Sequence, residues 1–297
     1  MSNSIKISSE ELRGLNLSSV PEKAKELANC SFCHYTSLDT LNKILESKSI
    51  HIGNIASMND LDEVELHSKD KHKVYSLCFC NSNTEKIPMW YLYAGIAGQG
   101  ASLEFTPSTM RKLLESIKTL ETKETGRVLK KNTDFRFRYG WVYYRKKGNP
   151  TEVKYRNKWY TIEDSAGFEE ENYFVKSYPW EYEREFRILI ILNDACNDER
   201  LVLKLPEEVQ NNLKIKLAPE ITPEKIKEML PELKGISEYL MDKLNHSKLN
   251  INMKLCERNF NSFVSYIREN TDKEDSKIDY SRICEAIAQN CQKNIKE

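Results

Sequence analysis

Three carboxylates and an arginine lie directly before the most apolar segment of the chain. They alternate with other residues, in the order Glu181, Glu183, Glu185 and Arg187. In an extended strand these four side chains would project from one face. Carboxylates this close repel one another, which raises their pKa values, and the arginine offsets part of that effect. The group predicts either a site that needs a fixed carboxylate or a solvated, salt-bridged edge.

The segment that follows is the strongest strand signal in the sequence. Residues 188–192 read Ile-Leu-Ile-Ile-Leu, a short unbroken apolar run. Such a run is typical of a central strand that is buried on both faces. We therefore expect the acidic group to lie at the end of a core strand, beginning at Trp180.

The charges balance over the whole chain but not along it. Lys plus Arg and Asp plus Glu each number 45 among 297 residues, so the total charge does not indicate a polyanionic partner. Residues 111–158 are predominantly basic, however, and residues 163–208 are predominantly acidic. Either the two blocks face each other across the fold, or the first block forms a basic surface for an anionic ligand.

The N-terminal sequence lacks the apolar core of a signal peptide, and the run at 188–192 is too short to span a bilayer. These features predict a soluble cytoplasmic protein, in which the 8 cysteines stay reduced.

Cysteine spacing suggests two kinds of prosthetic site, and each lacks one requirement. Cys30, Cys33 and His34 match a haem-attachment pattern, but that attachment requires export. Cys78 and Cys80 could join the first pair on zinc, yet only one residue separates them where zinc sites usually have at least two. We expect no metal site and interpret these cysteines as buried, unpaired thiols.

The order of expected elements favours an α+β fold with a mixed or antiparallel sheet over a doubly wound sheet. We divide the chain into an N-terminal arm or helix at 1–30, a core at 31–260 and a helical C-terminal segment at 261–297. Strands are expected at 31–36, 49–53, 74–79, 101–105, 135–143, 180–192, 201–205, 214–219 and 250–255. Helices are expected after Ser37, from Pro88, from Pro107, from Pro223, from Leu233 to Leu244, and beyond 261.

Residues 135–143 alternate five aromatic side chains with Arg136, Arg138, Gly140 and Val142. This period of two predicts a strand with one aromatic face. A sheet normally buries such a face against helices. Aromatic residues beside arginine can also form a platform on which bases stack, and that alternative stays open.

Several short motifs together resemble a bacterial domain family of unknown function. They cover roughly residues 31–260 and read His34-Tyr35-Thr36-Ser37, Met58-Asn59-Asp60, Ser76-Leu77-Cys78-Phe79, Pro88-Met89-Trp90 with Tyr93-Ala94, Gly100 with Glu104-Phe105, and Trp180 with Glu183, Glu185 and Arg187. The order of parts is also similar to the ADP-ribosyltransferase superfamily, which joins a polar residue on the first strand to a glutamate on a late strand.

The second resemblance implies NAD as a substrate and a role for each matching residue. Glu185 would be catalytic and Glu183 would place the acceptor, while His34 would hold the ribose hydroxyls of NAD with Tyr35 beside it. Breaking the nicotinamide bond creates a ribosyl cation, which a fixed carboxylate stabilises. The implied NAD-binding group consists of His34, Tyr35, Ser37, Trp90, Tyr93 and Arg187. The structural alternative is a semi-buried histidine, with Trp90 and Tyr93 in the core.

The resemblance implies NAD-dependent ADP-ribosyl transfer or NAD hydrolysis by a toxin or phage-defence effector. A nucleic acid or protein would accept the ADP-ribose, a regulatory partner protein would restrain the activity, and no membrane would be involved. One alternative is an RNA 2'-phosphotransferase-like enzyme. Another is a non-catalytic module for nucleotide sensing or protein interaction, in which Glu183, Glu185 and Arg187 would point away from His34.

Overall fold

The structure is a computed structural model. It describes residues 4–15, 30–58, 60, 63, 69, 72–81, 85–94, 100–146, 151–164, 171–219, 221 and 244–246. The chain divides into two compact units, which are described separately. Unit 1 comprises Met1–His34, Ser47–Asn83 and Glu104–Leu213, and unit 2 comprises Tyr35–Glu46, Thr84–Leu103 and Lys214–Glu297.

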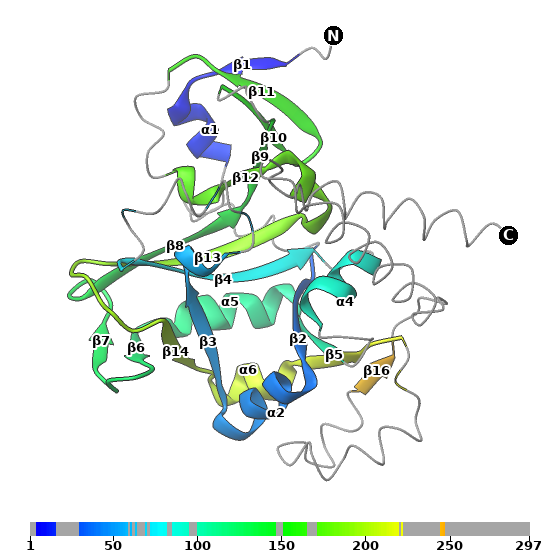
Figure 1. Cartoon of the computed structure of the whole chain (residues 1–297), viewed down its shortest axis with the longest axis vertical. Coiled ribbons are helices and arrows are strands. Elements are labelled where there is room, and N and C mark those ends of the chain that lie inside the picture. The colour runs from blue at the N-terminus through cyan, green and yellow to red at the C-terminus, as the bar shows by residue number, and fades with distance from the viewer. Residues whose placement is uncertain are drawn as a thin grey trace, which may run out of the picture. The chain divides into compact units, whose positions relative to one another are not determined.

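Unit 1 contains a five-stranded sheet. Its order is β1 (Ile5–Ile7), β11 (Lys158–Ile162), β10 (Glu152–Tyr155), β9 (Tyr143–Arg145) and β12 (Val175–Ser177). The outer pairs are parallel and the inner pairs are antiparallel. Helix α1 (Ser9–Leu15) is tied to this sheet by the Tyr143 hydroxyl, which donates to the Leu12 carbonyl at 3.1 Å, and by the Tyr155 hydroxyl, which donates to the Leu15 carbonyl at 2.8 Å (Figure 1).

The second sheet of unit 1 is built around two antiparallel strands, β4 (Val74–Asn81) and β13 (Glu185–Leu192). β8 (Phe135–Trp141) pairs with the other edge of β13. β3 (Ser49–Asn54) and the first residues of β2 (Phe32–Ser37) pair with the other edge of β4. The sheet continues from β3 through β14 (Arg200–Lys204), β6 (Thr119–Thr122) and β7 (Val128–Lys130).

Helices cover one face of this second sheet. α5 (Pro107–Ser116) lies beneath β4 and β13 in Figure 1 and packs with α6 (Glu207–Asn212). Thr106 caps α5 by accepting a hydrogen bond from the Thr109 amide at 3.2 Å, and Pro107 follows at the start of the helix. Two short 3₁₀ segments, η3 (Ile55–Ser57) and η6 (Glu171–Phe174), connect strands of the unit.

The predicted central strand is confirmed, because all eight residues of β13 are buried. Its predicted beginning is wrong. Tyr178–Glu183 form a 3₁₀ helix, η7, with Pro179 in its first turn, and Arg184 then adopts a left-handed conformation with φ of 43°. Proline favours the start of a helical turn, and a left-handed residue breaks the alternation of a strand. Glu181 and Glu183 therefore do not share a strand face with Glu185.

The expected strand at 135–143 is also divided. β8 ends at Trp141, and the Val142 amide donates to the Glu185 carbonyl at 2.9 Å. The chain then enters the five-stranded sheet as β9, where Tyr143 pairs with Val175. A single aromatic run thus contributes to two sheets.

Unit 2 includes α2 (Leu38–Ser47), α4 (Ile87–Tyr93), the first part of β5 (Gly100–Phe105), β15 (Lys214–Leu217) and β16 (Leu244–His246), which is parallel to β15. Gly100 lies against the end of α4, where an added Cβ would be 1.6 Å from the Ala94 carbonyl oxygen. Only glycine permits that approach.

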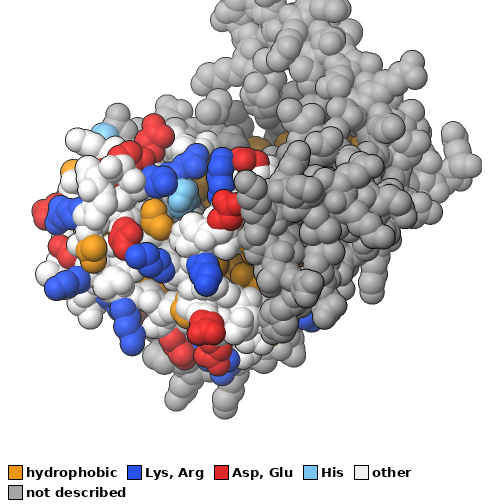
Figure 2. Space-filling model, turned by 90° about the horizontal axis from the view of Figure 1, so that it is seen from below, with side chains coloured by type: hydrophobic (Ala, Val, Ile, Leu, Met, Phe, Trp, Pro, Cys, Tyr) orange, Lys and Arg blue, Asp and Glu red, His pale blue; other side chains and the backbone are white. Residues whose placement is uncertain are grey.

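The mixed strands and helices agree with the expected combination of α and β structure. The expected strand at 250–255, the helix from Pro223 and the segment 261–297 lie outside the described residues. So does most of the helix expected to end at Leu244, but Leu244 itself begins the strand β16, and the expectation is wrong there. On the face seen in Figure 2, acidic and basic side chains are interspersed. Within the described part of the chain, no helix is long and apolar enough to cross a membrane.

Candidate functional site

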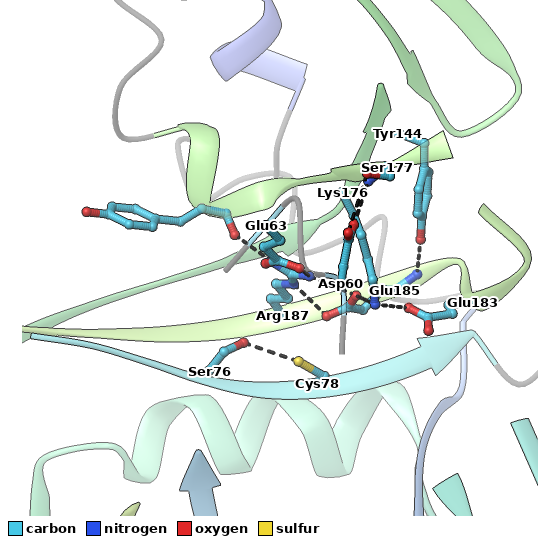
Figure 3. Close-up of polar contacts among 11 residues, drawn as sticks. Asp60, Glu63, Ser76, Cys78, Tyr144, Lys176, Ser177, Glu183, Glu185 and Arg187 are labelled. Carbon is cyan, nitrogen blue, oxygen red and sulfur yellow. Dashed lines mark hydrogen bonds and ion pairs between the residues drawn. The ribbon is translucent and has the colours of Figure 1, made fainter. Parts of the chain in front are cut away.

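The two faces of the β4–β13 pair have opposite chemistry. Glu185 is paired with Cys80 and Arg187 with Cys78, so these four side chains share one face. Phe186 and Phe79, which are directly paired, lie on the other. Figure 3 shows the charged side chains above the strands and α5 below them.

Arg187 is the centre of the charged face and is completely buried. Its guanidinium group holds two carboxylates. Nε lies 2.5 Å from Glu185 Oε1 and Nη2 lies 3.0 Å from Glu185 Oε2. On the other side, Nη1 and Nη2 both donate to the Glu63 carboxylate, and Nη1 also donates to the Tyr173 carbonyl at 2.9 Å. The planar guanidinium group thus forms a pair of hydrogen bonds with each of the two carboxylates, which is the geometry that arginine favours.

Lys176 supplies the second cation of the cluster. Its Nζ lies 2.6 Å from Glu183 Oε2 and 3.5 Å from Glu185 Oε2, and all three side chains are at most 5% exposed. The Trp180 ring lies 4.6 Å from the same ammonium. The charge cluster, defined as Glu63, Lys176, Glu183, Glu185 and Arg187, thus alternates carboxylates with cations across the space between the two sheets (Figure 3).

The elements around the cluster fix it through their own hydrogen bonds. The Tyr144 hydroxyl of β9 accepts from the Glu185 amide at 2.8 Å. The Asp60 carboxylate accepts from the Ser177 amide at 3.0 Å, at the point where β12 leads into η7. Both sheets and the segment that carries Asp60 and Glu63 therefore meet at this cluster.

Burial and neighbouring charge shift the pKa values of the cluster in different directions. Burial alone would raise the pKa of Glu185, but Arg187 and Lys176 outweigh it and hold that pKa at about 2. Burial raises the pKa of Glu63, and Arg187 offsets this only in part. Burial, with Glu185 nearby, also raises the pKa values of Cys78 and Tyr144. The crowding expected to raise the pKa of Glu185 is therefore overcome by its two cations.

His34 belongs to the opposite face of the same sheet. Its Nδ1 lies 2.9 Å from the Cys78 carbonyl oxygen, so it must carry the proton that it donates, and its ring lies 5.8 Å from that of Phe79. Burial lowers its pKa, against the effect of that hydrogen bond. Only β4 separates the strand of His34, β2, from the strand of Glu185, β13. The His34 side chain nevertheless points away from Glu185 and Arg187.

The remaining expected site residues lie in unit 2. Tyr35 is 8% exposed and meets the fully buried Trp90 edge to face at 4.8 Å. Ser37 accepts a hydrogen bond from the Thr40 amide at 3.2 Å and so caps α2. Tyr93 is half-buried in the last turn of α4. Tyr35 and Trp90 pack as core residues, and Ser37 acts as a helix cap.

Sequence reasoning missed Glu63, Lys176, Cys78 and Tyr144 as members or neighbours of the charged site. Each reaches Glu185 or Arg187 from a separate element, so no local pattern joins them. The available signals were weak: Asp60 precedes Glu63 by three positions in the sequence, and Lys176 is one of the few basic residues in an acidic block.

The candidate zinc thiols Cys30, Cys33, Cys78 and Cys80 form no disulfide bond with one another. Cys33 and Cys80 face each other in the β2–β4 register. Over the described ranges, no three His, Cys, Asp or Glu side chains are arranged to hold a metal ion.

These features define a mixed α and β protein with a charge cluster buried between two sheets. A family model described as a protein of unknown function (DUF2971) matches residues 89–188. That range includes Lys176, Glu183, Glu185 and Arg187, and it is shorter than the range over which the sequence motifs were expected to extend. No curated protein and no solved structure matches the chain.

Proposed function

We propose that the chain is a non-catalytic binding module, in which the charge cluster holds the two sheets of unit 1 together. The observation that carries this proposal is the engagement of the Glu185 carboxylate. Both of its oxygens meet Arg187, one also meets Lys176, and the side chain is 5% exposed. A carboxylate placed in this way has no open position for a ribose or an attacking water.

The placement of His34 supports the same proposal. A residue that holds the ribose of NAD must share a surface with the carboxylate that stabilises the ribosyl cation. His34 and Phe79 share one face, whereas Glu185 and Cys78 share the other. The sheet itself separates the two groups that the transferase-like interpretation pairs.

A second candidate is NAD-dependent ADP-ribosyl transfer or NAD hydrolysis, with Glu185 as the catalytic carboxylate. The favouring observation is that Glu185 stays ionised, with a pKa of about 2, beside two cations that could meet a pyrophosphate. In that reaction the bond between ribose C1′ and the nicotinamide nitrogen breaks, the electron pair leaves with nicotinamide, and an acceptor or water captures the cation.

Nicotinamide release from NAD by the full chain distinguishes the two candidates. The binding-module proposal predicts no release above the rate without protein, with or without added bacterial nucleic acid or lysate. Release that disappears in Glu185→Gln but persists in the exposed control Glu208→Gln would overturn it and establish the NAD reaction.

A further inference from the structure

We propose that Phe137 and Tyr139 of β8, with Lys131, form a surface that binds single-stranded nucleic acid. This inference deepens the proposed binding function by naming a surface and a ligand class. The three residues are called the β8 platform below. Tyr139 is paired with Ile188 and Phe137 with Ile190, and these side chains alternate with Arg187 along β13. The β8 platform therefore lies on the face of the second sheet opposite the charge cluster.

Only the two end residues of the aromatic row of β8 are buried in the core. Phe135 and Trp141 at its two ends are 0% and 6% exposed. Phe137 and Tyr139 between them are half-buried, with rings 6.3 Å apart and planes 28° from parallel. Both rings therefore keep part of their apolar area exposed to solvent.

One lysine lies over the platform, and two more are its neighbours along the backbone. Lys131 Nζ lies 4.5 Å from the centre of the Phe137 ring, and the Lys131 amide donates to the Lys118 carbonyl at 2.9 Å. Lys118, Lys130 and Lys131 are exposed, and none of them forms an ion pair with any described residue. The nearby Asp134 carboxylate is already occupied by Arg127 and by the Lys130 amide.

This combination fits single-stranded nucleic acid better than other ligands. Unpaired bases stack on aromatic side chains of a sheet surface, and each stacked base contributes about 1–3 kcal/mol. Lys131 beside the Phe137 ring, with the exposed Lys118 and Lys130 next to it along the backbone, would meet the phosphates between stacked bases. A duplex hides the faces of its bases, so it can use only the lysines. An apolar protein partner would leave the three ammonium groups without counter-charge.

The test is fluorescence anisotropy of the full chain with a labelled single-stranded oligouridine, its DNA equivalent and a duplex. Phe137→Leu combined with Tyr139→Leu keeps apolar side chains at both positions but removes both rings. We expect at least about a tenfold higher Kd for this variant. Lys131→Gln, at an exposed position, should raise Kd less and reduce the salt slope by about 0.7.

Two matched controls separate the platform from general effects. Trp159→Leu removes a different half-buried ring that also carries a lysine, Lys146, at 4.2 Å. Lys204→Gln removes an exposed lysine that is paired with Glu121. Both should bind as the wild type does. Wild-type protein that binds no oligonucleotide, or equal Kd values for the wild type, Lys131→Gln and the folded double variant, would overturn the inference. Neither result would change the nicotinamide assay, which tests the binding-module proposal separately.

Discussion

The two faces of β13 show how adjacent residues of one strand stabilise the fold in different ways. Phe186 and Ile188 are fully buried on the side of Phe79, where burial of apolar area stabilises the fold. Glu185 and Arg187 are equally buried on the side of β9 and β12, but each requires its partners to be present. Removing atoms from an apolar side chain lowers the stability in small steps, whereas removing the partner of a buried charge leaves that charge uncompensated.

The largest effect should come from the centre of the charged face. Arg187→Met leaves Glu63 and Glu185 buried without their guanidinium, and we expect a loss of about 3–5 kcal/mol in the free energy of unfolding. Urea unfolding followed by circular dichroism measures it. A loss below about 1 kcal/mol would mean that these carboxylates do not depend on Arg187.

Phe186→Ala should cost a similar amount on the apolar face, about 3–5 kcal/mol, because it opens a cavity beside Phe32 and Trp141. The two faces should then differ in pH dependence. The cost of Phe186→Ala should stay constant from neutral pH down to about pH 4, since no ionisable group is lost. A cost that varies with pH over that range would contradict the proposed division between the faces.

Glu185→Gln should show the opposite behaviour. Since Arg187 and Lys176 hold the folded pKa of Glu185 at about 2, below the ordinary 4.5, the folded state binds fewer protons than the unfolded one. The stability from Glu185 is therefore full above about pH 4.5 and is lost as the pH falls toward about 2. The difference in unfolding free energy between wild type and variant should shrink over that window, and a constant difference would show that Glu185 is not held ionised.

The smallest effect is expected for an ion pair at the surface. Lys204 Nζ lies 2.6 Å from Glu121 Oε1, but the two side chains are 73% and 37% exposed. Solvent screens this pair, so Lys204→Ala should change the free energy of unfolding by only about 0–1 kcal/mol. A loss comparable to that of Arg187→Met would mean that burial does not set the difference between these ion pairs.

Local sequence pattern predicted β2, α2, β3, β4, α4, β5, α5, β14 and β15, because caps, prolines and apolar periodicity act over a few residues. It failed at Trp180–Glu183 and at Val142, where the chain leaves a strand to change sheets. It identified Glu183, Glu185 and Arg187 as a charged group but not their partners. Glu63 and Lys176 reach the group from distant segments, and only the paired strands bring them together.

The most direct test of this account compares Arg187→Met with a triple variant, Glu63→Leu, Glu185→Leu and Arg187→Met, by urea unfolding at neutral pH. If the charges serve mainly to satisfy one another, the triple variant should regain most of the stability that the single variant loses, because none of these three charges remains unpaired. A triple variant less stable than Arg187→Met alone would contradict the account, since the carboxylates would then stabilise the fold without their arginine.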